Sequence, residues 1–491
     1  MQYRPPQLEP TSPVLAQLRE IVKRSGYLTA GIAPTIETTD DEIIDAPPDS
    51  PLYTLLRFFF SREPVQPAAL IEAVRPLSVQ QIMDCGFCRL DGELIRSNVL
   101  LQPYDDLLFA VGQFSLEPRR EEILMEISPS SMELANLMIP RPCRKTLDLG
   151  TGCGFLAALL SRSSEQVYAV DLNPTAVQFA KFNALWNGIS NVKCLQGNLF
   201  EPVRDLKFDL IVSNPPFFVC PVPTSSVNSL LFQHSGIEDD SFCIQLAHDA
   251  TGFLEEGGFF HMMFCWLERA GQGWKDKLTA AFSGMGCDAW CLRVSQDPAE
   301  HYIDVWCGDL GHMEHSEIEA LRQQAYRNFR KNGITSVGMG LLTLRRCSTR
   351  PSLLWFDEAP EDRSEPYGSS VEAIFDVRAR FDSVPDEIFL KQKFKAAPGV
   401  VSLQKASLQG NKWKPSGFEF GRESGLKYTF SGVNAFLAQV VSRLDGRRTL
   451  MQALEELSRE QEVPLARVIS GHLSSIRELL RYGFLLPASK R

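Results

Sequence analysis

The chain has 491 residues, of which 44% are hydrophobic and 22% are charged, and this is ordinary for a protein with several packed domains. Its formal net charge of −10 argues against broad non-specific binding to nucleic acid, and no apolar run is long enough to predict a membrane span. The 12 cysteines are scattered through apolar segments, so we expect reduced thiols and a cytoplasmic protein.

Residues 1–112 are predicted to form an N-terminal domain that resembles a winged helix. Helices are expected at 14–25, 51–60, 67–74 and 79–85, with an acidic linker at 38–49. A hairpin follows at 88–95 with a turn at Asp91-Gly92. Winged helices bind DNA, RNA or protein, but this hairpin carries few positive charges, so packing or protein contact is equally well supported. The Cys85-x-x-Cys88 pair lacks two further ligands, which favours buried thiols over zinc.

A glycine-rich turn follows a short buried strand that ends at Leu149. Gly150, Gly152 and Gly154 allow the backbone to turn sharply and to approach a ligand closely, because glycine tolerates positive φ and has no Cβ. A helix and a second strand follow, and that strand ends at Asp171, about 20 residues after the glycines, where a carboxylate would bind a ribose hydroxyl. Taken separately, this pattern also fits a dinucleotide-binding fold.

A second motif, Asn214-Pro215-Pro216-Phe217, directly follows a predicted strand at 208–212. Two prolines cannot continue a strand ladder, so the chain stops at the carboxyl end of the strand, where ligands bind in open α/β sheets. The Asn214 amide and the Pro215 carbonyl would accept the two N–H groups of a planar amine or amide, and Phe217 would stack on it. The motif therefore predicts a site for a planar nitrogen group rather than for a dinucleotide.

These motifs together resemble class I S-adenosylmethionine-dependent methyltransferases, in particular the methyltransferase small group with its Asn-Pro-Pro-Phe/Tyr signature. The resemblance covers roughly residues 128–346. The group includes ribosomal RNA guanine-N2, RNA adenine-N6 and release-factor glutamine-N5 methyltransferases. The resemblance implies an α/β fold with a Rossmann-like, seven-stranded methyltransferase core, which we place at residues 113–350. It also implies S-adenosylmethionine as the cofactor.

The resemblance further implies which residues bind the cofactor and which act on the acceptor. The methionine part would lie on Asp148, Gly150, Thr151, Gly152 and Gly154, and the ribose on Asp171 beside Leu172. Asn198 and Leu199 stand where the family usually has an acid at the adenine, and the Asn198 amide can replace it. Catalysis is assigned to Asn214, Pro215, Pro216 and Phe217, with Asn214 also close to the cofactor. Ser130 or Ser131 would contact the methionine end, or simply cap the helix expected at 132–138.

The remaining elements are predicted from apolar patterns. Strands are expected at 192–196, 259–264, 289–294 and 303–307, followed by a helix at 318–332 and an extended piece at 334–346. Residues 351–372 are acidic and contain prolines, which predicts a linker. Residues 373–491 are predicted to form a mainly helical C-terminal domain that resembles small winged-helix modules, with a three-helix packing domain as the alternative.

We predict an N-methyltransferase that acts on a planar exocyclic amine, with an RNA base, as in ribosomal RNA, as the expected acceptor. The alternatives are a protein glutamine, a small molecule or peptide, and a cofactor-binding scaffold without catalysis. Residues 391–395 and 412–414 combine lysines with an aromatic ring and could contact RNA, although a solvated face explains them too. The seven histidines show no metal-ligand spacing, so no metal is expected.

Overall fold

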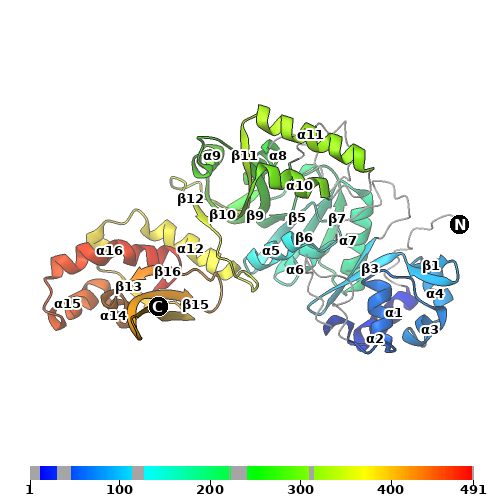
Figure 1. Cartoon of the computed structure of the whole chain (residues 1–491), viewed down its shortest axis with the longest axis horizontal. Coiled ribbons are helices and arrows are strands. Elements are labelled where there is room, and N and C mark those ends of the chain that lie inside the picture. The colour runs from blue at the N-terminus through cyan, green and yellow to red at the C-terminus, as the bar shows by residue number, and fades with distance from the viewer. Residues whose placement is uncertain are drawn as a thin grey trace. The chain divides into compact units, whose positions relative to one another are not determined.

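The computed structural model describes residues 12–29, 46–112, 126–219, 222, 240–308 and 314–488. The chain divides into two compact units (Figure 1). The first comprises Met1–Ala135 and Arg141–Asp357, and the second comprises Asn136–Pro140 and Glu358–Arg491. Most of the acidic linker predicted at 38–49 lies outside the described residues. No helix in the described ranges is long and apolar enough to cross a membrane.

A sheet of eight strands lies at the centre of the first unit, in the order β12-β10-β11-β9-β8-β5-β6-β7. Neighbouring strands from β9 to β7 are parallel, whereas β11 is antiparallel to both β9 and β10. The strands are β5 Cys143–Leu149, β6 Ser164–Asp171, β7 Val192–Gln196, β8 Phe208–Ser213, β9 Leu254–Arg269, β10 Cys287–Pro298, β11 Ile334–Arg346 and β12 Leu354–Glu358. The Rossmann-like core is thus confirmed, and β12, from the segment predicted as a linker, is added to it.

Helix α5 Pro129–Leu137 precedes β5, and the helices between the strands are α6 Phe155–Leu160, α7 Pro174–Trp186, α8 Ser241–Thr251, α9 Trp274–Phe282, α10 Ala299–Gly308 and α11 His315–Lys331. All residues of α6 are apolar and all are buried, so this short helix is enclosed rather than lying on the surface. Figure 1 shows α6 beside β5 and β6, within the first unit. The glycine-rich turn lies between β5 and α6.

The prediction of a strand at 303–307 is wrong, because these residues belong to α10. Tyr302, Ile303 and Trp306 are buried whereas Val305 is 53% exposed, and this is the spacing of a helix with one buried face. The remaining strand of the core is β11, which the sequence predicted only as an extended piece. Helices α10 and α11 are inserted between β10 and β11.

The N-terminal region has the predicted order of helices followed by a hairpin. Its elements are α1 Pro13–Arg24, η1 Tyr27–Thr29, α2 Pro51–Phe59, α3 Pro67–Ala73, α4 Val79–Asp84, β1 Cys88–Asp91 and β2 Leu94–Ser97. Gly92 occupies the β1–β2 turn with a φ of +64°, as expected for Asp-Gly. A second hairpin follows, formed by β3 Val99–Tyr104 and β4 Leu107–Gly112. This hairpin belongs to the same compact unit as the central sheet.

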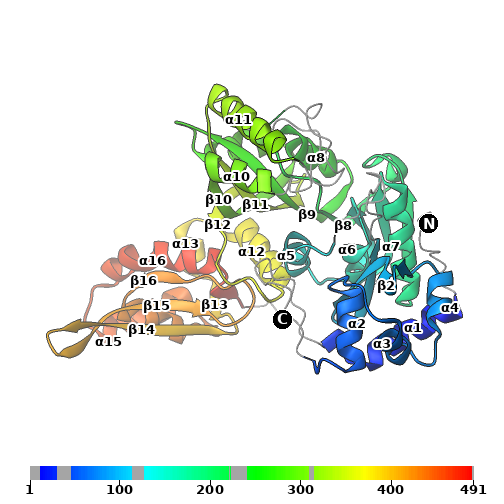
Figure 2. The ribbon, with the colours of Figure 1, turned by 45° about the vertical axis from the view of Figure 1, so that its right-hand side comes forward.

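The second unit combines helices with two sheets of three strands, β17-β13-β18 and β14-β15-β16. Figure 2 shows β14 and β15 as a long hairpin beside the helices of this unit. The elements are α12 Gly368–Phe381, α13 Asp386–Phe389, β13 Lys393–Ala396, β14 Val400–Gln409, β15 Lys412–Arg422, β16 Phe430–Val433, α14 Ala435–Arg443, β17 Asp445–Thr449, α15 Leu450–Glu460, α16 Leu465–Arg481 and β18 Leu485–Pro487. This unit has its own apolar core.

The two basic-aromatic segments of this unit differ in the position of their ring. Phe394 is fully buried, and its ring centre lies 5.5 Å from that of Phe381 and 5.1 Å from that of Phe389. It therefore cannot stack on a nucleobase, and the RNA-contact reading of residues 391–395 is wrong in this respect. Trp413, by contrast, is 71% exposed beside Lys412 and Lys414, at the start of β15.

Phe394→Ala should destabilise the second unit by about 3–5 kcal/mol, because it leaves a cavity among packed rings. Trp413→Ala should change stability by less than about 0.5 kcal/mol, since that side chain is mostly solvated. Hydrogen exchange of the α15 and α16 amides, followed by mass spectrometry, measures the effect within this unit. Equal protection in the two variants would contradict the assignment of Phe394 to the core.

Candidate active site

The glycine-rich turn is held by hydrogen bonds to two carboxylates at the ends of β5 and β6. Oδ2 of Asp148 accepts hydrogen bonds from the Thr151 hydroxyl at 2.6 Å and from the Ala157 amide at 2.9 Å. Oδ2 of Asp171 accepts one from the Gly152 amide at 2.9 Å. The structure therefore brings together the residues that the sequence assigned to the methionine and ribose ends of the cofactor.

The three glycines of the turn differ in the space that an added Cβ would find. All have positive φ, at +76° for Gly150, +55° for Gly152 and +85° for Gly154. A Cβ on Gly154 would lie 2.9 Å from Cα of Ala180, so this glycine allows the turn to pack against α7. A Cβ on Gly150 or Gly152 would have no described atom within 4 Å. The space beside these two glycines is therefore open, which suits a ligand lying against the backbone.

The charge state of Asp148 depends on its burial. The residue is 1% exposed, and this burial raises the pKa of its carboxyl group to about 7, against the lowering effect of the hydrogen bonds from Thr151 and Ala157. Oδ1 of Asp148 is buried and has no hydrogen-bond partner among the described residues. A cationic donor would satisfy this oxygen and favour the charged carboxylate. Burial also raises the pKa of Asp171.

The residues predicted beside the ribose and at the adenine lie at the ends of neighbouring strands. Leu172, directly after β6, is 63% exposed, and Asn198, after β7, is also exposed. Leu199 has a φ of +47°, which is uncommon outside glycine and marks a sharp bend after β7. The Asp171 carbonyl accepts a hydrogen bond from the Gly197 amide at 3.0 Å, which joins the two strand ends. An exposed apolar side chain and an amide thus flank this edge of the sheet, and their role in binding the cofactor stays a prediction.

In the side-chain amide of Asn214, only the nitrogen has hydrogen-bond partners among the described residues. Its Nδ2 donates to the hydroxyls of Ser130 and Ser131 of α5, at 3.0 and 2.9 Å. Asn214 is 8% exposed, and its Oδ1 is buried without a hydrogen-bond partner in the described part of the chain. Ser128 joins this cluster, since its hydroxyl lies 2.8 Å from that of Ser130 and 3.1 Å from that of Ser131. The serines therefore contact the asparagine that was predicted to be catalytic, a role that the sequence reasoning did not consider.

The chain after Asn214 is anchored by a residue that sequence reasoning missed. The hydroxyl of Tyr302, on the inserted helix α10, donates to the Val219 carbonyl at 3.0 Å. Phe217 is buried, whereas Phe218, whose ring centre is 4.7 Å away, is 44% exposed. Tyr302 lies 83 residues from Val219, and no motif connects them in the sequence.

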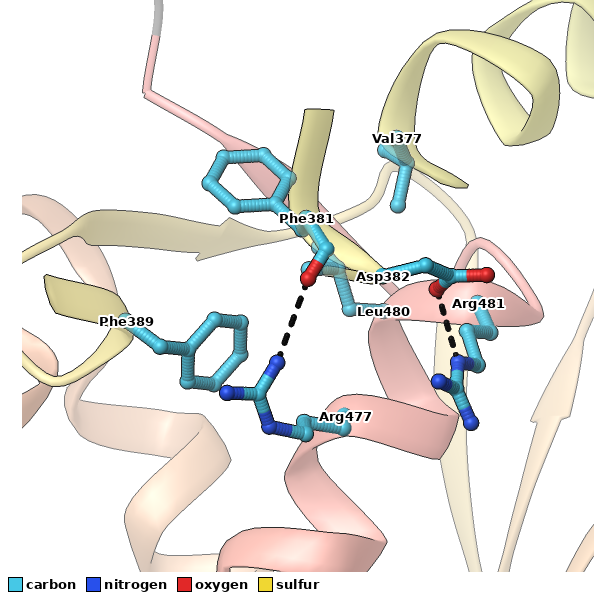
Figure 3. A pocket seen from close by; sticks show the side chains of 7 residues that line it. All are labelled: Val377, Phe381, Asp382, Phe389, Arg477, Leu480 and Arg481. Atoms are coloured by element: carbon cyan, nitrogen blue, oxygen red, sulfur yellow. Dashed lines mark hydrogen bonds and ion pairs between the residues drawn. The ribbon is translucent and has the colours of Figure 1, made fainter. Parts of the chain in front are cut away.

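Neither a metal-ligand cluster nor the hollow in the second unit offers an alternative site among the described residues. Within the described ranges, no group of three or more His, Cys, Asp or Glu side chains is arranged to hold a metal ion. A small hollow in the second unit is lined by Val377, Phe381, Asp382, Phe389, Arg477, Leu480 and Arg481 (Figure 3). Arg477 donates to the carbonyls of Phe381 and Val384, and Arg481 pairs with Asp382 at 2.8 Å. The charged groups there are thus mutually satisfied.

The central sheet, the glycine-rich turn and the Asn-Pro-Pro-Phe segment at the carboxyl end of β8 define a class I methyltransferase. A family model described as "Methyltransferase small domain" matches residues 126–262. The release factor glutamine methyltransferase of Aquifex aeolicus (strain VF5) is 34% identical over 166 residues, which are 31% of this chain and 55% of that protein. The release factor glutamine methyltransferase of Salmonella typhimurium is 34% identical over 197 residues, 38% of this chain and 69% of that protein.

The solved structure of the tRNA m1G37 methyltransferase of M. jannaschii is 15% identical, over 51% of this chain and 57% of that one. Its TM-score of 0.28 is too low to support a conclusion about the function of this chain. The chain thus spans 55% and 69% of the length of the two curated relatives named above. It belongs to the class I S-adenosylmethionine-dependent methyltransferases of the methyltransferase small group.

S-adenosylmethionine is the cofactor of this family, and the residues present fit it. The unpartnered Oδ1 of Asp148 would take the positively charged amino group, and the open space at Gly150 and Gly152 would receive the methionine part. Asp171 would bind the ribose hydroxyls with the lone pairs that its backbone hydrogen bonds leave free.

Gly152→Ala should weaken S-adenosylmethionine binding by at least about tenfold, because the methyl group would occupy the space proposed for the cofactor. Gly188→Ala is a matched control, because Gly188 also has positive φ and no described atom within 4 Å of an added Cβ. Both variants therefore carry a similar backbone strain. Calorimetry with the purified variants should show the loss for Gly152 only, and equal affinities would refute the placement.

The affinity for S-adenosylmethionine should fall as the pH drops below about 7, since the pKa of Asp148 is raised to about 7. Below this pKa the carboxyl is protonated and neutral, so the cation must displace a proton in order to bind. The loss should approach roughly tenfold per pH unit between pH 6.5 and 5.5. Calorimetric titrations at these pH values measure it, with Asp148→Asn as the variant expected to bind weakly and without this dependence.

Proposed function

We propose that the chain transfers the methyl group of S-adenosylmethionine to the side-chain amide nitrogen of a glutamine in a protein. The observation that carries the proposal is the Asn214 amide, whose Nδ2 is held by Ser130 and Ser131 while its buried Oδ1 has no partner among the described residues. That oxygen can accept an N–H group at the carboxyl end of β8. The similarity to release factor glutamine methyltransferases supports a protein acceptor over the RNA base expected from the motif.

The chemistry requires an arrangement of this kind. When bound, S-adenosylmethionine supplies an activated methyl group that needs no further leaving-group catalysis. An amide nitrogen is a weak nucleophile because its lone pair is delocalised. Asn214 Oδ1 would accept one N–H of the acceptor amide and the Pro215 carbonyl the other, orienting the nitrogen and stabilising the positive charge that develops on it. Phe217 would stack on the planar group and exclude water.

A nucleobase amine is the second candidate acceptor, because its N–H groups have the same planar geometry. The observation that favours it is Trp413, exposed between Lys412 and Lys414, a combination that stacks on bases and contacts phosphates. A small molecule or peptide with an amide would use the same site. A scaffold role would need no acceptor at all.

The acceptor can be identified by its label. The full chain is incubated with methyl-tritiated S-adenosylmethionine and either a purified peptide-chain release factor or total RNA. Label that survives nuclease and is released by protease as N5-methylglutamine supports the proposal. Label in nuclease-sensitive material would transfer the assignment to a nucleobase, and no label in either arm would contradict both acceptors.

Asn214→Ala should leave cofactor affinity nearly unchanged and lower turnover by roughly a hundredfold or more, since one preorganised acceptor contributes on the order of 3 kcal/mol to the barrier. Phe217→Tyr is the companion variant and should retain substantial activity, because stacking persists. Turnover is measured on the labelled acceptor and affinity by calorimetry. Wild-type turnover in the Asn214→Ala variant would refute the amide-methylation mechanism.

A further inference from the structure

We propose that the β3–β4 hairpin of the N-terminal region is part of the active-site scaffold. Through Asn183 it positions the glycine-rich turn for the cofactor, and through Gln102 it positions the serine cluster behind Asn214. Figure 1 shows β3 between the N-terminal helices and the core. The Asn183 part concerns the cofactor site and is independent of the acceptor, whereas the Gln102 part rests on the role proposed for Asn214.

Asn183 of α7 and Asn187, the residue directly after α7, pair with β4 as a neighbouring strand would. Oδ1 of Asn183 accepts from the Ala110 amide at 2.9 Å, and its Nδ2 donates to the Ala110 carbonyl at 2.9 Å. Asn187 makes the same two bonds with Leu108, at 3.1 and 2.9 Å. The asparagines are four positions apart, about one helical turn, and so lie on the same side of the carboxyl end of α7, opposite alternate residues of β4. The edge of the hairpin is thereby completed by side chains of the core.

Only one of these asparagines reaches the cofactor turn. Asn183 is fully buried, and its Nδ2 also donates to the Cys153 carbonyl at 2.9 Å, between Gly152 and Gly154. The second bond of Asn187 Nδ2 goes to the Asn183 carbonyl at 2.8 Å, at the carboxyl end of α7. Asn183 therefore links β4 directly to the turn, and Asn187 does not.

Apolar contacts reinforce this link at α6. The ring centres of Tyr104 and Phe109, from the two strands of the hairpin, lie 4.8 and 5.6 Å from that of Phe155, the first residue of α6. Just beyond the other end of α6, Arg162 pairs with Asp105 and Asp106 in the hairpin turn, at 2.8 and 2.7 Å. The ion pairs are exposed and contribute little, so the rings carry most of the contact.

The other strand of the hairpin supports the acceptor side. Gln102 is 6% exposed, and its Oε1 accepts a hydrogen bond from the Ile127 amide at 2.7 Å. Ile127 directly precedes Ser128, whose hydroxyl contacts those of Ser130 and Ser131. These two serines hold Nδ2 of Asn214. Gln102 is thus a positioning residue that acts on Asn214 through the start of α5.

Matched variants separate the cofactor branch of the proposal, which runs through Asn183, from the acceptor branch, which runs through Gln102. Asn183→Ala should weaken S-adenosylmethionine binding by about tenfold in calorimetry, because the turn loses its link to β4. Asn187→Ala removes equivalent bonds to β4 without touching the turn and should change the affinity by less than about twofold. Gln102→Met keeps the volume but removes the acceptor, and it should leave the affinity within about twofold as well. Equal losses for Asn183 and Asn187 would overturn the cofactor branch.

Hydrogen exchange tests both branches without any acceptor. In the wild-type chain, S-adenosylmethionine should slow exchange of the Ala110 amide more than that of the Leu108 amide, which is bonded to Asn187. In Gln102→Met, amides at the start of α5 should exchange faster than in Asn187→Ala. Uniform protection of the two β4 amides, or unchanged α5 exchange in Gln102→Met, would overturn the corresponding branch. Because these measurements need no methylation, their failure is distinguishable from failure of the proposed function.

Discussion

The glycine-rich turn between β5 and α6 depends on hydrogen bonds from side chains that lie outside it. Asp148 holds its beginning through Thr151, Asp171 holds the Gly152 amide, and Asn183 holds the Cys153 carbonyl. Glycines leave the backbone free to adopt many conformations, so the turn has no preference of its own for this one. The surrounding strands and helices impose its conformation, and the surface proposed for the cofactor therefore depends on all of them.

Two buried oxygens are left without a partner in the described part of this otherwise well-bonded site. They are Oδ1 of Asp148 and Oδ1 of Asn214, at the ends of the adjacent strands β5 and β8. A buried polar atom without a hydrogen bond costs the fold on the order of 1–3 kcal/mol. A ligand that donates to such an atom recovers this cost, and it meets an acceptor that is already oriented. The positions of these oxygens match the two roles proposed here, the cofactor amino group and the acceptor amide.

Support for the site comes from parts of the chain that are distant in sequence. The β3–β4 hairpin reaches the turn and α5, and the inserted helix α10 reaches the segment after Phe217 through Tyr302. The bonds that connect them are neutral and buried, so salt should affect them little, in contrast to surface ion pairs. These peripheral elements therefore contact the site through residues other than those proposed to touch cofactor or acceptor.

The sequence by itself determined the parallel strands of the core and the family, because these depend on short-range patterns, whereas its assignment of residues to the ligands stays a prediction. Glycine spacing, the acid after a strand and Asn214 before two prolines each carry local conformational meaning. Residues 303–307 were misassigned because a short apolar run fits a strand as well as a helix, and only packing against the core chose α10.

Tertiary structure alone decided how Asn183, Gln102 and Tyr302 act. The partners of Asn183, Ala110 and Cys153, lie 73 and 30 residues away in the sequence. Ile127 lies 25 residues from Gln102, and Val219 lies 83 residues from Tyr302. A buried amide or hydroxyl must find a hydrogen-bond partner, but its sequence neighbours do not reveal which one. That choice is made only when strands and helices pack, because the geometry of a hydrogen bond is set by the positions of whole elements rather than by local conformation.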